Sequence, residues 1–152
     1  LDVTTRKCKV ELLNDRSFRI VLTQGLNRQI RRMCEELGTG WDKIVLTCEM
    51  LQLPAPKIEL YEESTKVTLF SEIPYSNLPP EDKLWACYLH ACVLQVQGEQ
   101  LTNSSLRERF GVASSSSASI SRLIKDAVEL KLIKPLDPNT APRYMKYVPG
   151  WA

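Results

Sequence analysis

The sequence predicts an α+β fold, in which a small hairpin-helix unit is followed by a C-terminal winged helix-turn-helix domain. Three observations support this prediction. Short runs that alternate apolar and polar residues occur in pairs, as in β-hairpins. Beyond residue 80, three consecutive segments have helical periodicity and are followed by two strand-like runs. A proline-rich stretch, IPYSNLPP at 73–80, separates the two parts of the chain.

Composition limits the class of protein. The chain has 152 residues, 43% of them hydrophobic, and a formal net charge of +2, which is typical of one or two ordinary globular domains. Residues 1–38 carry eight Lys/Arg against five Asp/Glu, residues 39–78 three against six, and residues 79–152 nine against seven. The mildly basic ends favour nucleic-acid contact. No apolar run is long enough for a membrane span, and five cysteines without framework spacing indicate a reducing, cytoplasmic location.

The first 38 residues predict a hairpin and a helix. Apolar and polar residues alternate over 7–13 and 17–23, with a turn at Asn14-Asp15-Arg16. From Asn27, a helix with one apolar stripe is expected to continue to Leu37. Arg28, Arg31 and Arg32 form a cationic strip beside that stripe.

Residues 39–73 predict a second helix and a second hairpin. Ile44, Val45, Cys48 and Leu51 recur at helical spacing, and the helix should end before Pro54. Strand-like runs follow at 57–61 and 66–70, joined by an acidic turn.

Residues 80–152 predict the winged helix. The first helix, 80–96, carries two adjacent apolar faces and should be buried nearly all round. A short helix from Thr102 or Asn103 should end at Gly111, and a third helix beginning within 114–117 should bury the stripe Ile120, Leu123, Ile124, Ala127 and Leu130. Strands at 132–136 and 143–148 would form the wing.

The third helix of a winged helix enters the major groove of DNA, so its solvent face should be polar and cationic. Hydroxyl groups and cations on that face and on the wing would contact phosphates and base edges of double-stranded DNA. The candidate DNA-binding residues are Ser115, Ser117, Ser119, Arg122, Lys125, Lys134, Arg143 and Lys146. The alternative is a winged helix used for protein interaction or for homodimerisation.

From residue 38 onward the sequence resembles the C-terminal part of the Schlafen-AlbA-type ATP-binding proteins, which include transcriptional regulators and RecG-related ATP-dependent DNA helicases. The matching phrases are LGTGWDKIV, LPAPKIEL, KVTLF, LTNSSLRERFG, SRLIKDAVELKLIKP and YVPGWA. The resemblance implies that 39–73 ends a GHKL-like ATP-binding module and that a full-length parent binds ATP. No cofactor is expected for this chain alone, although Gly38, Thr39 and Gly40 before a helix could hold a phosphate.

Residues 1–38 resemble the C-terminal piece of bacterial ribosomal large-subunit pseudouridine synthases. The resemblance rests on FRIVLTQGLNRQIRRMCEELG at 18–38 and implies that Arg28, Arg31 and Arg32 contact RNA. The family's catalytic Asp belongs to a Gly-Arg-Leu-Asp phrase, which Leu1-Asp2 matches only superficially. We therefore expect no catalysis from this chain, and an RNA-binding remnant of a synthase is the alternative function.

A metal site is not expected. Cys87, His90 and Cys92 share one predicted helix, but no Cys-x-x-Cys pair or second histidine accompanies them.

Overall fold

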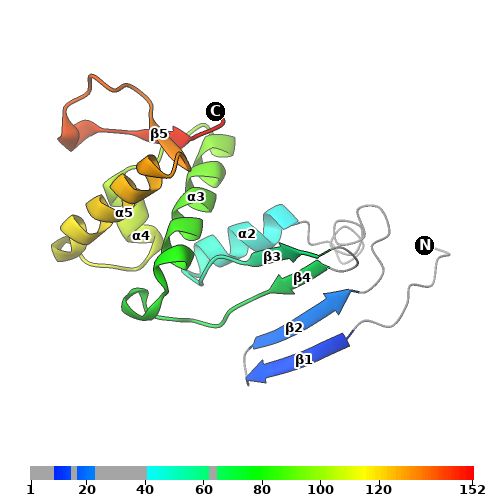
Figure 1. Cartoon of the computed structure of the whole chain (residues 1–152). Coiled ribbons are helices and arrows are strands. Elements are labelled where there is room, and N and C mark those ends of the chain that lie inside the picture. Colours follow the sequence, from blue (N-terminus) through cyan, green and yellow to red (C-terminus); the bar gives the residue numbers. More distant parts are fainter. Residues whose placement is uncertain (1–8, 15–16, 23–40, 62–64) are drawn as a thin grey trace. The chain divides into compact units, whose positions relative to one another are not determined.

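The computed structural model describes residues 9–14, 17–22, 41–61 and 65–152, and it is an α+β protein, as the sequence predicts (Figure 1). The described residues fall into two compact units, Leu1–Glu72 and Ile73–Ala152, within which the helices and strands pack. The predicted segments 1–38 and 39–73 belong to the same N-terminal unit. A boundary between them at residue 38 stays a prediction. The predicted helix at 27–37, with its arginine strip, lies outside the described residues.

The N-terminal unit contains one four-stranded antiparallel sheet with the order β1-β2-β4-β3. Its strands are β1 (Lys9–Asn14), β2 (Ser17–Leu22), β3 (Lys57–Leu60) and β4 (Thr65–Thr68). Both predicted hairpins are present, and β3 and β4 end one and two residues before the predicted strand ends. The sequence did not reveal that β2 also pairs with β4, with Arg19 opposite Thr68 and Leu22 opposite Thr65. The two hairpins are therefore halves of one sheet.

Helix α2 (Trp41–Met50) lies between the two hairpins in the sequence and buries Val45 and Cys48, two residues of the predicted helical spacing. The helix ends before Pro54, as predicted, and it does not reach Leu51. Leu51 lies one residue beyond α2 and is 62% exposed. Gln52 adopts a positive φ of 55°, so the chain turns here and the helical stripe ends before Leu51.

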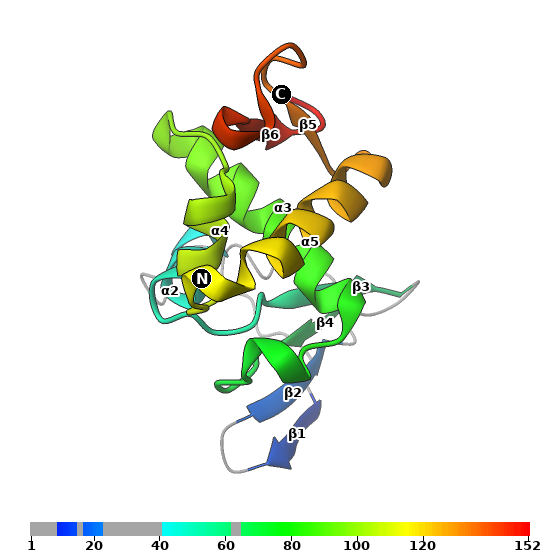
Figure 2. The ribbon, with the colours of Figure 1, turned by 90° about the vertical axis from the view of Figure 1, so that its left-hand side faces the viewer.

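The C-terminal unit has the element order helix, helix-turn-helix, two-stranded wing, which is compatible with a winged helix. The elements are α3 (Pro80–Gln97), α4 (Asn103–Arg109), α5 (Ser117–Glu129), β5 (Ile133–Pro135) and β6 (Tyr147–Pro149), with short 3₁₀ turns η1 (Tyr75–Asn77), η2 (Ser114–Ser116) and η3 (Pro142–Tyr144). Helices α4 and α5 pack beside α3, and β5 and β6 lie at one end (Figure 2).

The core of this unit lies between α3, α4 and α5. It contains Cys87, Ala91, Leu94, Leu101, Leu106, Ile120, Leu123, Ile124, Ala127 and Ile133. Residues 82–95 of α3 are all buried or half-buried, as predicted, whereas Val96 in its last turn is 85% exposed. Leu130, predicted to continue the stripe of α5, is 60% exposed because α5 ends at Glu129. Periodicity identified the helices but not their lengths or the side that neighbours cover.

Helix α4 begins where the sequence predicts and ends just before the predicted stop at Gly111. The Thr102 hydroxyl accepts a hydrogen bond from the Ser105 N–H at 3.0 Å, and the Ser105 hydroxyl accepts one from the Thr102 N–H at 3.0 Å. This capping box satisfies two backbone donors, so Thr102 is the N-cap and Asn103 is free for another role. Gly111 has a φ of 60° and lets the chain leave the helix.

The wing is shorter than predicted. The Asp137 carboxylate accepts hydrogen bonds from the Asn139 N–H at 2.9 Å and from the Thr140 hydroxyl at 3.2 Å, which turns the chain after β5. Arg143 lies in η3, so its predicted place on a strand is wrong. Leu101 makes two backbone hydrogen bonds to Tyr147, 3.0 and 2.9 Å long, which tie the wing to the start of α4.

Within the described ranges, no helix is long and apolar enough to cross a bilayer.

Candidate nucleic-acid interface

Asn103 joins the first turns of α4 and α5. Its amide nitrogen donates to the Ser117 carbonyl and to the Ser121 hydroxyl, both at 3.0 Å. Its amide oxygen accepts from Arg107 Nε at 3.0 Å and from the Ser117 hydroxyl at 3.2 Å. These four contacts use both donors and both acceptor lone pairs of the carboxamide. The Asn103 side chain therefore fixes the distance between the start of α4 and the start of α5.

Arg107 is held in place by the same network. Besides Asn103, its guanidinium reaches the Ser104 hydroxyl at 3.4 Å through Nη2. These two contacts occupy two of the five guanidinium N–H donors, so the group can still bind an anion. Arg107 is only half-exposed, which limits the number of its rotamers.

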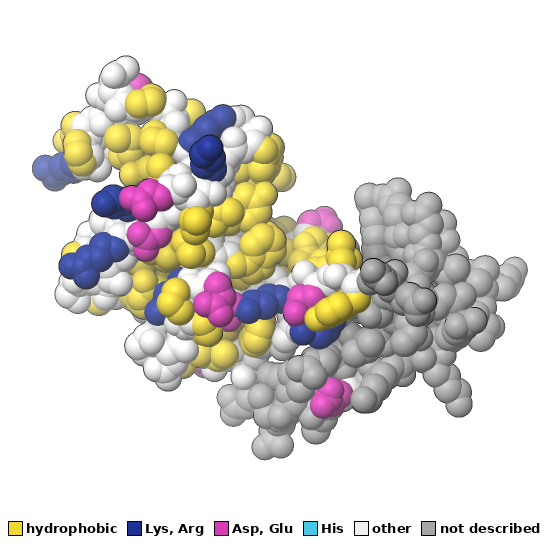
Figure 3. Space-filling view, in the orientation of Figure 1, with side chains coloured by type: hydrophobic (Ala, Val, Ile, Leu, Met, Phe, Trp, Pro, Cys, Tyr) yellow, Lys and Arg dark blue, Asp and Glu magenta, His cyan; other side chains and the backbone are white. Residues whose placement is uncertain are grey.

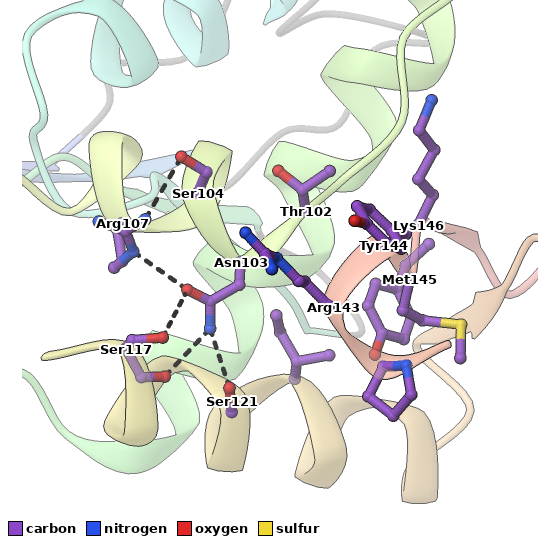
Figure 4. A pocket seen from close by; sticks show the side chains of 13 residues that line it. Thr102, Asn103, Ser104, Arg107, Ser117, Ser121, Arg143, Tyr144, Met145 and Lys146 are labelled. Atoms are coloured by element: carbon purple, nitrogen blue, oxygen red, sulfur yellow. Dashed lines mark hydrogen bonds between the residues drawn. The ribbon is translucent and has the colours of Figure 1, made fainter. Parts of the chain in front are cut away.

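The network forms one wall of a groove, which we call the α4–η3 groove, and the turn η3 forms the other (Figure 4). Its volume is about 800 Å³. The groove is lined by Thr102, Asn103, Ser104, Arg107, Ser117, Ser121, Ile124, Pro142, Arg143, Tyr144, Met145, Lys146 and Tyr147. Arg107, Arg143 and Lys146 give it three cations, and this lining set contains no Asp or Glu. The electrostatics of the groove therefore favour an anionic ligand.

The walls of the groove are ordered by local contacts. Lys146 Nζ donates to the Gln100 side-chain oxygen at 3.3 Å, which restricts the position of the ammonium. The Arg143 guanidinium lies 5.8 Å from the centre of the Tyr144 ring. Burial raises the pKa of the Tyr147 hydroxyl, so this tyrosine stays neutral at physiological pH.

The structure separates the predicted DNA-binding residues into different environments. Ser117, Arg143 and Lys146 line the α4–η3 groove. Ser119 and Arg122 instead line a smaller pocket of about 220 Å³ beside η1 and the start of α3. The remaining members of the set are exposed and lie outside both hollows: Ser115, Lys125 and Lys134.

Several of these side chains already have partners. The Ser117 hydroxyl donates to Asn103, and the Ser119 hydroxyl lies 3.3 Å from the Tyr75 hydroxyl. Lys125 is paired with Glu129 across one helical turn at 3.7 Å, an exposed pair that a phosphate could displace. Lys and Arg side chains appear as separate groups on the face of this unit seen in Figure 3, with acidic and apolar side chains between them. This face does not present one continuous basic patch.

Sequence reasoning missed ten of the thirteen residues that line the groove. Asn103, Arg107, Ser121 and Tyr144 are among these ten. The pair Asn103 and Arg107, spaced i, i+4 on a helix, was a signal that could have been read from the sequence. Tyr144 could not be placed because it was expected on a strand rather than in η3.

The other predicted sites lie outside the described residues. These are the arginine strip Arg28, Arg31 and Arg32 and the phosphate-loop candidates Gly38, Thr39 and Gly40. The described part of the chain contains no cluster of three metal-ligating side chains.

A 47-residue stretch, 31% of this chain, is 60% identical to the dual-specificity RNA pseudouridine synthase RluF of Escherichia coli. The proteins of the same name from Shigella flexneri and Salmonella typhi match over the same length with the same identity. Each match spans 16% of the relative's length. No protein-family model matches the chain, and no solved structure matches it. The chain thus shares a segment with these synthases, whereas the resemblance to ATP-binding regulators gains no support from the comparisons.

Proposed function

We propose that the chain binds RNA through its N-terminal segment and does so without catalysis. The observation that supports the proposal is the 60% identity over 47 residues to RNA pseudouridine synthases named RluF. Three arginines at positions 28, 31 and 32 belong to the phrase that resembles the synthase family. Arginine contacts phosphate through a planar, multiply donating group, which suits RNA.

Binding of ribosomal RNA fragments at several salt concentrations tests this function. Arg28→Ala, Arg31→Ala and Arg32→Ala together should weaken binding. If all three contact phosphates, the slope of log affinity against log salt should become shallower by about 2, since each contact with a single strand contributes about 0.7. Pseudouridine formed above background and abolished by Asp2→Asn would contradict binding without catalysis.

A second candidate function is duplex DNA binding by the C-terminal unit, as part of an ATP-binding transcriptional regulator. It is favoured by the helix-turn-helix order of α4 and α5 and by the exposure of Arg122, Lys125 and Lys134. Exposed cations of this kind contact phosphates and position a helix in the major groove. ATP would be bound by other parts of the full-length parent.

Duplex DNA binding is tested by removing those cations. Arg122→Ala with Lys125→Ala should weaken duplex binding and make the salt slope shallower by about 1.8, at about 0.9 per phosphate contact. The triple arginine variant at 28, 31 and 32 is the control, because it should leave duplex binding unchanged. If the triple variant alone lost DNA binding, the C-terminal unit would not be the DNA-binding element.

A further inference from the structure

We propose that the α4–η3 groove binds an unpaired strand of nucleic acid, with a base stacked on Tyr144 and phosphates held by Arg107, Arg143 and Lys146. This site differs from both surfaces proposed above. The RNA proposal concerns residues 28–32, and the duplex proposal concerns the exposed cations of α5 and β5. The groove proposal depends on neither of them.

The first argument is charge. Three cations line the groove and no lining residue is acidic, although the whole chain carries only two more Lys/Arg than Asp/Glu. The cations come from both walls, with Arg107 on α4 and the other two on or next to η3. A polyanion lying along the groove would therefore meet positive charge on each side.

The second argument is the exposed aromatic ring. Tyr144 is 68% exposed and lies at the groove, next to the cationic Arg143. An exposed aromatic ring beside cations is the arrangement on which single-stranded nucleic acids stack their bases, because every base has a flat face. The internal bases of a duplex are stacked on one another and cannot offer that face to Tyr144.

The third argument is shape. The groove volume of about 800 Å³ lies within the range of ligand pockets, roughly 300–1,000 Å³. Asn103 and Ile124 are among the residues that line it. A flexible strand can follow such a recess, whereas a rigid duplex has to be met by a protruding element that enters its groove.

The fourth argument is preorganisation. Asn103 fixes Arg107 through the 3.0 Å bond to Nε, and Gln100 holds Lys146 at 3.3 Å. Two of the three cations are therefore positioned before a ligand arrives, which lowers the conformational entropy lost on binding.

The test uses the full chain carrying Arg28→Ala, Arg31→Ala and Arg32→Ala, so that the proposed N-terminal RNA contacts are removed. Fluorescence anisotropy compares labelled oligouridylate, labelled oligothymidylate and a labelled blunt duplex. Tyr144→Ala should weaken binding of the preferred single strand about tenfold, as expected for loss of one stacked base. Tyr144→Phe should retain binding, because it keeps the ring. Tyr61→Ala, which removes another exposed tyrosine, is the matched control and should have no effect.

Two-dimensional amide NMR of the same protein locates the bound strand. Shifts at 103, 107, 121 and 143–147 on titration would support the groove, and preference for oligouridylate or oligothymidylate would identify RNA or DNA as the ligand. Three results would overturn the proposal: no single-strand binding, equal affinity for the chains with Tyr144 and with Tyr144→Ala, or shifts confined to other residues. Because the arginine triad is absent throughout, failure of the N-terminal RNA proposal cannot produce any of these results.

Discussion

Replacing Asn103 with alanine tests whether the contact between α4 and α5 depends on one side chain. The substitution removes a carboxamide that makes four hydrogen bonds, to Arg107, to the Ser121 hydroxyl and to both the hydroxyl and the carbonyl of Ser117. Most of these contacts can be reached by water. Water would therefore replace the lost partners in part.

The magnitude follows from the number of bonds. A hydrogen bond contributes about 0.5–1.5 kcal/mol net, and the lower figure suits exposed groups, so four bonds contribute about 2 kcal/mol. Alanine is a better helix former than asparagine by about 0.5 kcal/mol, which offsets part of the loss. The free energy of unfolding of the C-terminal unit should therefore fall by about 1.5 kcal/mol. For a unit of this size the melting temperature should fall by about 6–12 °C.

Urea unfolding followed by tryptophan fluorescence measures this change in a Trp41→Phe background. The two remaining tryptophans, Trp85 and Trp151, both lie in the C-terminal unit. Asn139→Ala is the matched control, because Asn139 is exposed and contributes its backbone N–H to the turn at Asp137. If the two alanine variants lost the same stability within about 0.5 kcal/mol, the carboxamide would not connect the helices.

Three other substitutions test the backbone and a half-buried titratable group. Gly150→Ala should cost about 3 kcal/mol because its Cβ would lie within 2.3 Å of the Lys131 carbonyl oxygen, a case of overpacking. Gly98→Ala should cost about 1 kcal/mol, because the new Cβ meets no atom within 4 Å and only the φ of 79° is strained. Equal losses of unfolding free energy for the two alanine variants in urea would contradict the close approach of the backbone at Gly150 to that at Lys131. Burial raises the pKa of Tyr147, so the folded chain holds this proton to higher pH than the unfolded chain. The resulting contribution of Tyr147 to the free energy of unfolding is fully present below the ordinary tyrosine pKa of about 10. It is lost as pH rises through the raised pKa of the folded state. Tyr147→Phe should make this alkaline loss smaller, and an unchanged pH profile would show that Tyr147 does not contribute to it.

Local patterns were enough to predict the helices of the C-terminal unit. Helix periodicity and the hydroxyl cap at Thr102 are properties of adjacent residues, so both could be read without knowing the fold. Val96 and Leu130 were placed wrongly because burial depends on which neighbours cover a face and where a helix ends. The pairing of β2 with β4 was missed for a related reason, since alternation predicts a strand but not its partner.

The candidate site was less predictable than the fold. The predicted residues were chosen by residue type on one helix face and one hairpin, whereas the groove is formed by α4, α5 and η3 together. Ser117 illustrates the difference. Its hydroxyl was expected to face DNA, but it donates to Asn103 and therefore supports the groove wall. A hydroxyl has only one proton to donate, and internal bonds compete for it with any ligand.

The sheet of the N-terminal unit explains how β2, the strand of the segment that resembles the synthases, is stabilised in this chain. An isolated two-stranded hairpin is marginally stable in water. Here β2 pairs on one edge with β1 and on the other with β4, and β3 completes four strands. The strand that precedes the arginine strip is thus the second of four and not an edge strand. Strand β4 supplies the second partner of β2, so this chain itself contains the strand that covers the other edge of β2.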